Sequence, residues 1–146
     1  MDFRGPAPRL EHVFDIRIDF KDRWRLGPLP EGGEQGYTSV LSGLVEGPRL
    51  NGKVVDVSGA DWAHMRPDGV IDLNAHYLLE ADDGTRIYIY NQGYVNPNTD
   101  PHYFRCTPYF KVPVGPHDWL SRTVIIGGGE RKTDPDHTIF RYWAVY

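Results

Sequence analysis

Two histidines, His64 and His76, stand with Asp72 and Tyr90 in a part of the chain where acid and base chemistry could be built. Imidazole titrates at about pH 6.5, so a histidine can take up and release a proton near neutrality. A carboxylate can orient an imidazole, and a phenol can polarise a substrate carbonyl or stabilise a phenolate. These four residues are therefore the candidate catalytic groups.

Tight turns decide which of these side chains meet. The segments 67–69 (Pro-Asp-Gly) and 82–84 (Asp-Asp-Gly) each suit a three-residue hairpin loop that ends on a left-handed glycine. The resulting register pairs His64 with Asp72 and His76 with Tyr90, at about 5 Å across neighbouring strands. The alternative is that His64 and Asp72 form a surface pair without function, contributing about 0.2–1 kcal/mol.

The same register gives these strands two faces. The apolar face comprises Ala63, Met65, Ile71, Leu73, Ala75, Tyr77, Leu79, Ile87 and Ile89. The polar face carries the four catalytic candidates and the candidate ligand-binding residues Trp62, Arg66, Asn74, Tyr88, Gln92, Tyr103 and Arg105. Antiparallel sheets normally turn the apolar face to the core and the polar face to solvent. However, several aromatic rings beside two histidines are more typical of a ligand pocket, so we expect the polar face to line the interior.

The binding roles follow from side-chain chemistry. Arg66 and Arg105 could hold a carboxylate or phenolate, although a solvated arginine on a strand is the commoner case. Tyr88, Tyr103 and Trp119, together with Trp62, would form the cavity wall.

The composition predicts one all-β domain over residues 1–146. The chain has 16 glycines, 12 prolines and 9 tyrosines, which indicate many turns and strands. Alternation in HVFDIRIDF predicts a half-buried strand, and further strands are expected near 37–46, 50–57, 60–66, 70–81, 85–95, 102–112, 122–127 and 137–146. Residues 21–36 are expected to form a loop or lid, and PHDWLSR one helical turn. About nine strands, within a range of 8–10, favour an antiparallel barrel or sandwich.

Charge and motifs exclude several classes of function. The net charge of −4 and the scattered lysines and arginines argue against a nucleic-acid partner. The histidines show neither HxH nor HExxH spacing, so no metal and no cofactor is expected. Cys106, the one cysteine, falls on the apolar side of its strand as a buried thiol and suits a reducing cytoplasm. Neither a signal peptide nor an apolar run of about 18 residues is present, so we expect a cytoplasmic protein without a membrane segment.

Several motifs resemble a known family. GLVEGPRLNGKVV, the segment SGADWAHMRPDGVIDLNAHYLLEADDGTRIYIYNQG, YFRCTPYF and WLSRTVIIGGG are similar, in this order, to the family named domain of unknown function 3237. The resemblance covers about residues 10–146 and implies a calycin-like antiparallel β-barrel that can form a homodimer. The family usually has Ala-Arg-Tyr where this chain has Ala75-His76-Tyr77. A titratable group thus replaces a permanent cation, which could turn an anion clamp into an acid or base, or could indicate a different ligand altogether.

These features together predict a small-molecule-binding barrel. We expect a cofactor-independent acid/base enzyme of the isomerase, cyclase or lyase type, acting on a small aromatic or carbonyl compound. One alternative is a lipocalin-like carrier that binds such a molecule without changing it. Another is an interaction subunit whose apolar face docks a partner and which has no ligand cavity.

Overall fold

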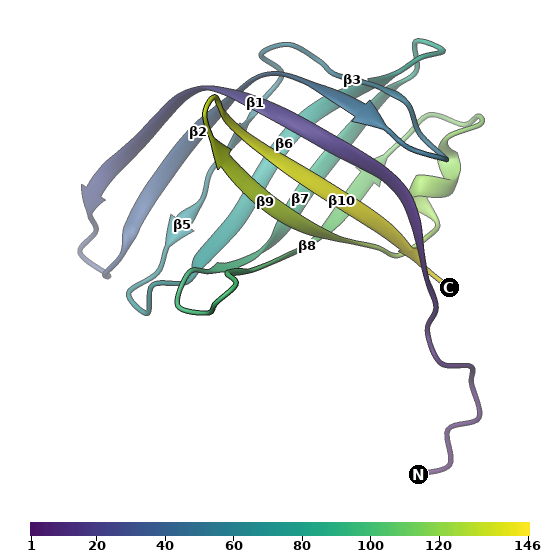
Figure 1. The fold of residues 1–146 in the computed structure, drawn as a ribbon, viewed down its shortest axis with the longest axis horizontal. Helices are drawn as coiled ribbons and strands as arrows, with labels where there is room; N and C mark the ends of the chain where they lie inside the picture. Colours follow the sequence, from purple (N-terminus) through teal and green to yellow (C-terminus); the bar gives the residue numbers. More distant parts are fainter.

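The computed structural model describes residues 1–146 and consists almost entirely of antiparallel strands (Figure 1). The strands are β1 (Leu10–Pro28), β2 (Glu34–Glu46), β3 (Gly52–Val54), β4 (Ala60–Asp61), β5 (His64–Met65), β6 (Ile71–Ala81), β7 (Arg86–Asn96), β8 (Tyr103–Lys111), β9 (Ile125–Thr133) and β10 (Asp136–Val145). The predicted helical turn is present as the 3-10 helix η1 (Asp118–Ser121). The all-β prediction is confirmed, and no helix of the structure has the length and apolarity needed to cross a bilayer.

The strands close into an irregular barrel. Around the ring, β1 is followed by β10, β9, β8, β7 and β6, and β2 returns to β1. The three short strands β3, β4 and β5 share the position between β6 and β2, and each pairs with both of them. The joint between β8 and β9 comprises two residue pairs, Arg105 with Gly128 and Cys106 with Gly127. Closure of the ring covers the strand edges that an open sheet would expose.

The predicted hairpin registers are confirmed. His64 lies opposite Asp72, and His76 lies opposite Tyr90. Both turns are three-residue loops, and their glycines, Gly69 and Gly84, have φ values of +86° and +87°. The left-handed conformation that fixes each register is one that glycine adopts without steric cost.

The expectation of a loop or lid over residues 21–36 is wrong. Strand β1 continues to Pro28 and pairs with β2 through Arg23, Trp24 and Arg25, with several register shifts along the way. The glycines and prolines that suggested a loop are accommodated at these irregularities and in the short turn over residues 29–33. The ladder between β1 and β10 ends at Asp19, so this part of the β1–β2 ribbon extends beyond β10 (Figure 1).

The expectation that the polar face lines the interior is also wrong. Leu73, Ala75, Tyr77, Ile87 and Ile89 belong to the buried core, whereas the polar face is half-exposed on the outside. The usual hydrophobic preference therefore prevails, because turning the charged face inward would bury polar groups without partners. Cys106 lies in this core as expected, and burial raises the pKa of its thiol to about 12.

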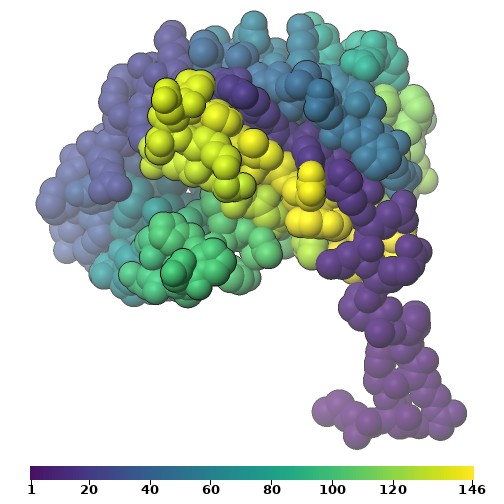
Figure 2. Space-filling model, viewed as in Figure 1, coloured from purple at the N-terminus to yellow at the C-terminus, as the bar shows by residue number.

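The interior has a packed half and a hollow half. In the packed half, Phe14 and Tyr142 are fully buried with ring centroids 5.1 Å apart, and Phe14 also contacts Phe110 edge-on. The hollow half contains a cavity of about 770 Å³. Figure 2 shows the surface hollowed on this side, between the yellow-green tip of the β9–β10 hairpin and the green loop that joins β7 to β8.

Candidate functional site

Most of the predicted site residues come together in a groove on the outer face of the sheet. The groove has a volume of about 630 Å³ and includes Trp62, His64, Arg66, Asp72, Asn74, Tyr90 and Gln92. Trp62 is 50% exposed and packs against Tyr37, with ring centroids 4.8 Å apart. The sequence therefore identified a real cluster of side chains, but on the opposite side of the sheet from the interior.

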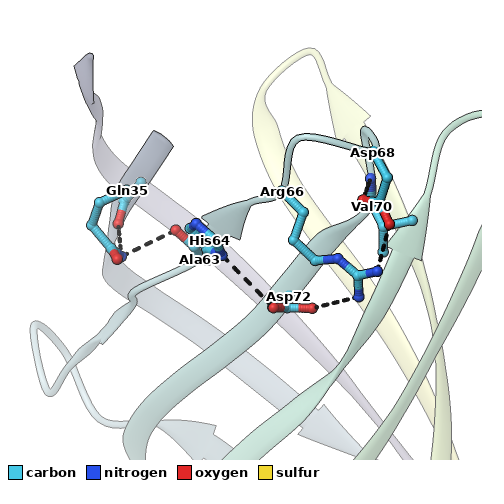
Figure 3. A network of polar contacts seen from close by, with 8 residues as sticks. Gln35, Ala63, His64, Arg66, Asp68, Val70 and Asp72 are labelled. Atoms are coloured by element: carbon cyan, nitrogen blue, oxygen red, sulfur yellow. Dashed lines mark hydrogen bonds and ion pairs between the residues drawn. The ribbon is translucent and has the colours of Figure 1, made fainter. Parts of the chain in front are cut away.

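Polar contacts hold this outer cluster together (Figure 3). The Arg66 guanidinium donates to the carboxylates of Asp68 and Asp72. His64 Nδ1 lies 3.9 Å from the other Asp72 oxygen, and its Nε2 is buried without a hydrogen-bond partner. The arginine thus shares the carboxylate with the histidine, which weakens the specific His64–Asp72 pairing.

His76 belongs to a neighbouring part of the same face. Its ring stacks on Tyr90, with centroids 4.2 Å apart, and its Nδ1 is hydrogen-bonded to the hydroxyl of Tyr88. Tyr103 and Arg105 are also on this outer face, and both are exposed. Trp119 lies elsewhere, in η1 against the packed half of the core, where the Arg49 guanidinium covers its ring. Trp119 therefore does not line either site.

The cavity inside the barrel has an apolar floor and a polar wall. Its apolar lining includes Ile18, Phe20, Val40, Leu73, Phe104 and Phe140. The volume of about 770 Å³ falls within the range of about 300–1,000 Å³ that is common for small-molecule sites. A drug-sized molecule with an aromatic body fits such a space.

One cross-strand row contributes several of the polar residues of the wall. The register places Arg23 of β1 opposite Thr38 of β2, Thr38 opposite Asp61 of β4, and Asp61 opposite Ala75 of β6. Ala75 in turn lies opposite Asn91 of β7. All five residues line the cavity. Side chains that share a row of a sheet point to the same face, so the row forms a polar band across the cavity wall.

Asp61 is the ionisable group of this band whose pKa is shifted from its ordinary value. Its Oδ1 accepts a hydrogen bond of 3.0 Å from the Asn74 backbone N–H. Burial raises the pKa of Asp61 to about 6, although this hydrogen bond and the nearby positive charge of Arg23 oppose the shift. A carboxyl that titrates close to neutrality can act both as a base and as an acid.

Two further buried groups at the cavity wall lack hydrogen-bond partners. Asn91 is 0% exposed, and neither its amide nitrogen nor its amide oxygen is paired; its polar neighbour is the Cys106 thiol, a weak partner. The hydroxyl of Tyr77 has the Tyr142 hydroxyl as a neighbour but no well-formed hydrogen bond, and burial raises the pKa of Tyr77, so the hydroxyl keeps its proton. Unpaired buried polar atoms cost stability, which makes them candidates for ligand contacts.

Salt bridges join two strands at the mouth of the cavity. Arg23 donates from two nitrogens to the Asp136 carboxylate at 3.2 Å each, and Arg131 lies 3.5 Å from the same carboxylate. The Arg23 pair joins the extended β1–β2 ribbon to the β9–β10 hairpin. Burial opposes the ionisation of Asp136, but the two arginines together outweigh it and lower the pKa of this carboxyl.

The residues of the cavity wall were not predicted from the sequence. The signal for Asn91 is nevertheless present, because it continues the apolar alternation of Ile87 and Ile89 with an amide. Asp61 likewise precedes Ala63 and Met65 with the same two-residue spacing. A polar residue at an expected core position works against folding, so its presence there indicates a functional role.

Close approach of β4 to β6 positions Asp61, and Gly59 permits it. A Cβ atom on Gly59 would lie 1.7 Å from the carbonyl oxygen of His76. We expect Gly59→Ala to lower the free energy of unfolding by about 1–3 kcal/mol, as overpacked sites do. Urea denaturation measures this change.

The matched control for Gly59 is Gly84→Ala. Gly84 has open space around its Cβ position but a φ of +87°, so its substitution costs only left-handed strain, about 1–2 kcal/mol. If the two sites are independent, the losses in the free energy of unfolding of Gly59→Ala and Gly84→Ala should add in the double variant. NMR titration of the Asp61 carboxyl in each variant reports whether its environment has changed. An unchanged Asp61 titration in folded Gly59→Ala would show that Gly59 does not position this carboxyl.

The fold and the cavity define an antiparallel β-barrel-like protein with an internal, polar-banded pocket. The chain belongs to the family described as Protein of unknown function (DUF3237), whose sequence model matches residues 8–145. It is 32% identical over 148 residues to a UPF0311 protein of Rhodopseudomonas palustris strain TIE-1, covering 88% of this chain and 92% of the relative. The family predicted from the motifs is confirmed.

Solved structures agree with the fold. A β-barrel-like protein from Acinetobacter baumannii AYE superimposes with a TM-score of 0.89 at 26% identity, covering 99% of this chain and 100% of the other. A protein described as an enzyme from Penicillium herquei superimposes with a TM-score of 0.80 at 18% identity, with both chains fully covered. At this low identity the second likeness concerns the fold.

Proposed function

We propose that this protein binds a small aromatic or carbonyl compound inside the barrel and transfers protons on it without a cofactor, as an isomerase, cyclase or lyase does. The observation that carries this proposal is the half-buried carboxyl of Asp61, with a pKa of about 6, on the wall of a largely apolar cavity. A group with this acidity is half-protonated near pH 6, so it can remove a proton from one atom and return it to another. The fold shared with a protein described as an enzyme is consistent with this role.

The interior offers a better site for this chemistry than the outer groove. A largely apolar wall lowers the local dielectric, which strengthens the interaction of a carboxylate with its substrate. In the outer groove the Asp72 side chain is 40% exposed and Arg66 already neutralises it. The outer histidines remain the candidates for a second site, and the groove around Trp62 and His64 is where a ligand of that site would lie.

A carrier without turnover is the second candidate function. The observation that favours it is the apolar lining, which would bind a hydrophobic molecule whether or not Asp61 reacts with it. The two functions predict the same ligand affinity for the wild type. They differ only in the chemical fate of the bound molecule.

A thermal-shift screen with phenolic and ketone compounds tests where ligands bind. A ligand that binds only the native state stabilises it by about 2.7 kcal/mol when the ligand concentration is 100 times its Kd. This stabilisation is seen as a higher melting temperature. We expect such shifts for the wild type and for His64→Gln, but not for Ala63→Leu, which places a larger side chain in the cavity. Ala63→Leu is first checked for a cooperative thermal transition.

The opposite pattern would assign binding to the outer groove. In that case the shift would disappear in His64→Gln and persist in Ala63→Leu. Absence of any shift for the wild type across the panel would contradict ligand binding by the cavity.

A further inference from the structure

Within the polar band, the small residue Ala75 lies between two polar side chains. Asp61 and Asn91 flank Ala75 in the same row, on the two strands that neighbour β6. Strands lie about 4.8 Å apart, so the two flanking Cα atoms are separated by about 10 Å. Ala75 carries only a methyl group, and the space above it opens into the cavity. A ligand group lying over Ala75 thus has a carboxyl on one side and an amide on the other.

The Asn91 amide is a polar group at a position where the strand otherwise carries core isoleucines. It is fully buried, and its donor and acceptor atoms have no partner stronger than the neighbouring Cys106 thiol. Leucine of similar volume would avoid the cost of burying these atoms, since an unsatisfied polar group costs about 1–3 kcal/mol. An amide at this place is explained if a ligand completes its hydrogen bonds.

We propose that the Asp61–Ala75–Asn91 row recognises an enolisable ketone, with Asp61 as the base for the α-hydrogen and Asn91 as the donor to the carbonyl oxygen. This inference rests on the proposed function of the same cavity and names its substrate class. The apolar floor holds the hydrocarbon body of the ketone, while the row orients its reacting end.

The reaction conserves atoms and electrons. The α-C–H bond breaks, its proton moves to a carboxylate oxygen of Asp61, and its electron pair forms the C=C bond of an enolate. The carbonyl π electrons move onto oxygen, where the Asn91 Nδ2–H hydrogen bond stabilises the negative charge. Return of the proton from Asp61 to the same or a conjugated carbon gives back the ketone or an isomer. No oxidant, reductant or metal takes part.

Hydrogen–deuterium exchange at the α-carbon tests this step directly. The protein is incubated in D₂O with 2-tetralone, 1-indanone or acetylacetone, and deuterium uptake is followed by mass spectrometry. We expect the wild type to accelerate uptake by at least one of these ketones. Asn91→Leu should slow the catalysed exchange by about 10²-fold, the usual cost of losing one oxyanion donor.

Tetralin, which lacks the carbonyl of 2-tetralone, provides the matched ligand. The wild type should bind the ketone about 3- to 10-fold more tightly than tetralin, the effect of one neutral hydrogen bond, and Asn91→Leu should bind both equally. Asn51→Leu makes the same substitution on an exposed side chain outside the cavity and should retain the wild-type preference. Thermal melting of each variant shows that it is folded.

The outcomes separate the two proposals. If tetralin and the ketone bind equally well to the wild type, or if Asn91→Leu exchanges as fast as the wild type, the substrate class is wrong while the cavity remains a binding site. If the wild type binds the ketones but exchange occurs only at the rate of buffer, the enolisation step is overturned. If neither compound nor any ketone binds, the proposed function and this inference fall together.

Discussion

Asp61→Asn is expected to reduce turnover by about 10²–10⁴-fold while changing ligand affinity by less than a few-fold. Asparagine has the shape of aspartate, and its Oδ1 can keep the hydrogen bond from the Asn74 backbone N–H. It cannot accept a proton, so only the chemical step is lost. Steady-state kinetics on a ketone from the exchange screen, together with calorimetric binding, measures the two effects separately.

The same measurement distinguishes an enzyme from a carrier. A carrier binds the ligand in both forms and has no catalysed rate to lose. Asp72→Asn is the matched substitution on the outer face, because it removes a carboxylate that lies near His64. If Asp72→Asn reduces the rate and Asp61→Asn does not, the reaction belongs to the outer groove.

Asp61→Asn should also stabilise the fold above pH 6. The pKa of Asp61 rises from about 3.8 in the unfolded chain to about 6 in the native state. Between these values the native state binds more protons than the unfolded state, so the free energy of unfolding of the wild type falls as pH rises. The full loss is about 2–3 kcal/mol and is complete above about pH 7. The asparagine side chain does not titrate, so the variant escapes this loss.

Urea denaturation from pH 3.5 to 8 measures this effect as a difference between the two proteins. The stability advantage of the variant should grow between about pH 4 and about pH 7 and then remain constant. A difference that does not change with pH would show that Asp61 is an ordinary solvated carboxyl. A half-buried carboxyl with a raised pKa on a cavity wall is typical of a functional group.

Phe14→Ala is expected to lower the free energy of unfolding by about 3–5 kcal/mol. Phe14 is 0% exposed and contacts the rings of Phe110 and Tyr142 in the packed half of the barrel. Its removal leaves a void that the surrounding strands cannot fill. Because Phe14 does not line the cavity, the folded variant should bind ligands with wild-type affinity.

Phe14→Leu is the graded control, because it retains most of the buried apolar volume. It should cost less than about 1.5 kcal/mol. If Phe14→Ala and Phe14→Leu lower the free energy of unfolding by similar amounts, the side chains around Phe14 rearrange to fill the void. Loss of ligand binding in folded Phe14→Ala would mean that the two halves of the interior are coupled.

Much of the fold could be predicted because local rules determine it. Glycine at Gly69 and Gly84 selects the turns, and the turns set the register of three strands. The orientation of the sheet could not be settled by the same rules, since alternation distinguishes two faces without assigning them to the interior or to solvent. The aromatic rings of the outer face misled the assignment. They pack against neighbouring rings, as Trp62 does on Tyr37 and His76 on Tyr90, which shields part of their surface from water on the outside of the barrel.

The site itself depends on contacts between residues far apart in the chain. Arg23, Thr38, Asp61 and Asn91 become neighbours only when β1, β2, β4, β6 and β7 are aligned across the ring. No spacing in the sequence reports such a row, and a lone amide among isoleucines resembles an exception rather than a motif. The division of one position of the barrel among the three short strands β3, β4 and β5 could not be predicted either, because each strand is only two or three residues long.

The two-pair joint between β8 and β9 has a mechanical consequence for the barrel. Neighbouring ladders such as β6–β7 and β9–β10 contain nine or more pairs and resist sliding. We therefore expect a change in circumference to concentrate at this joint, where few hydrogen bonds must break. Parting this one seam would widen the cavity while the longer ladders keep the rest of its wall in place.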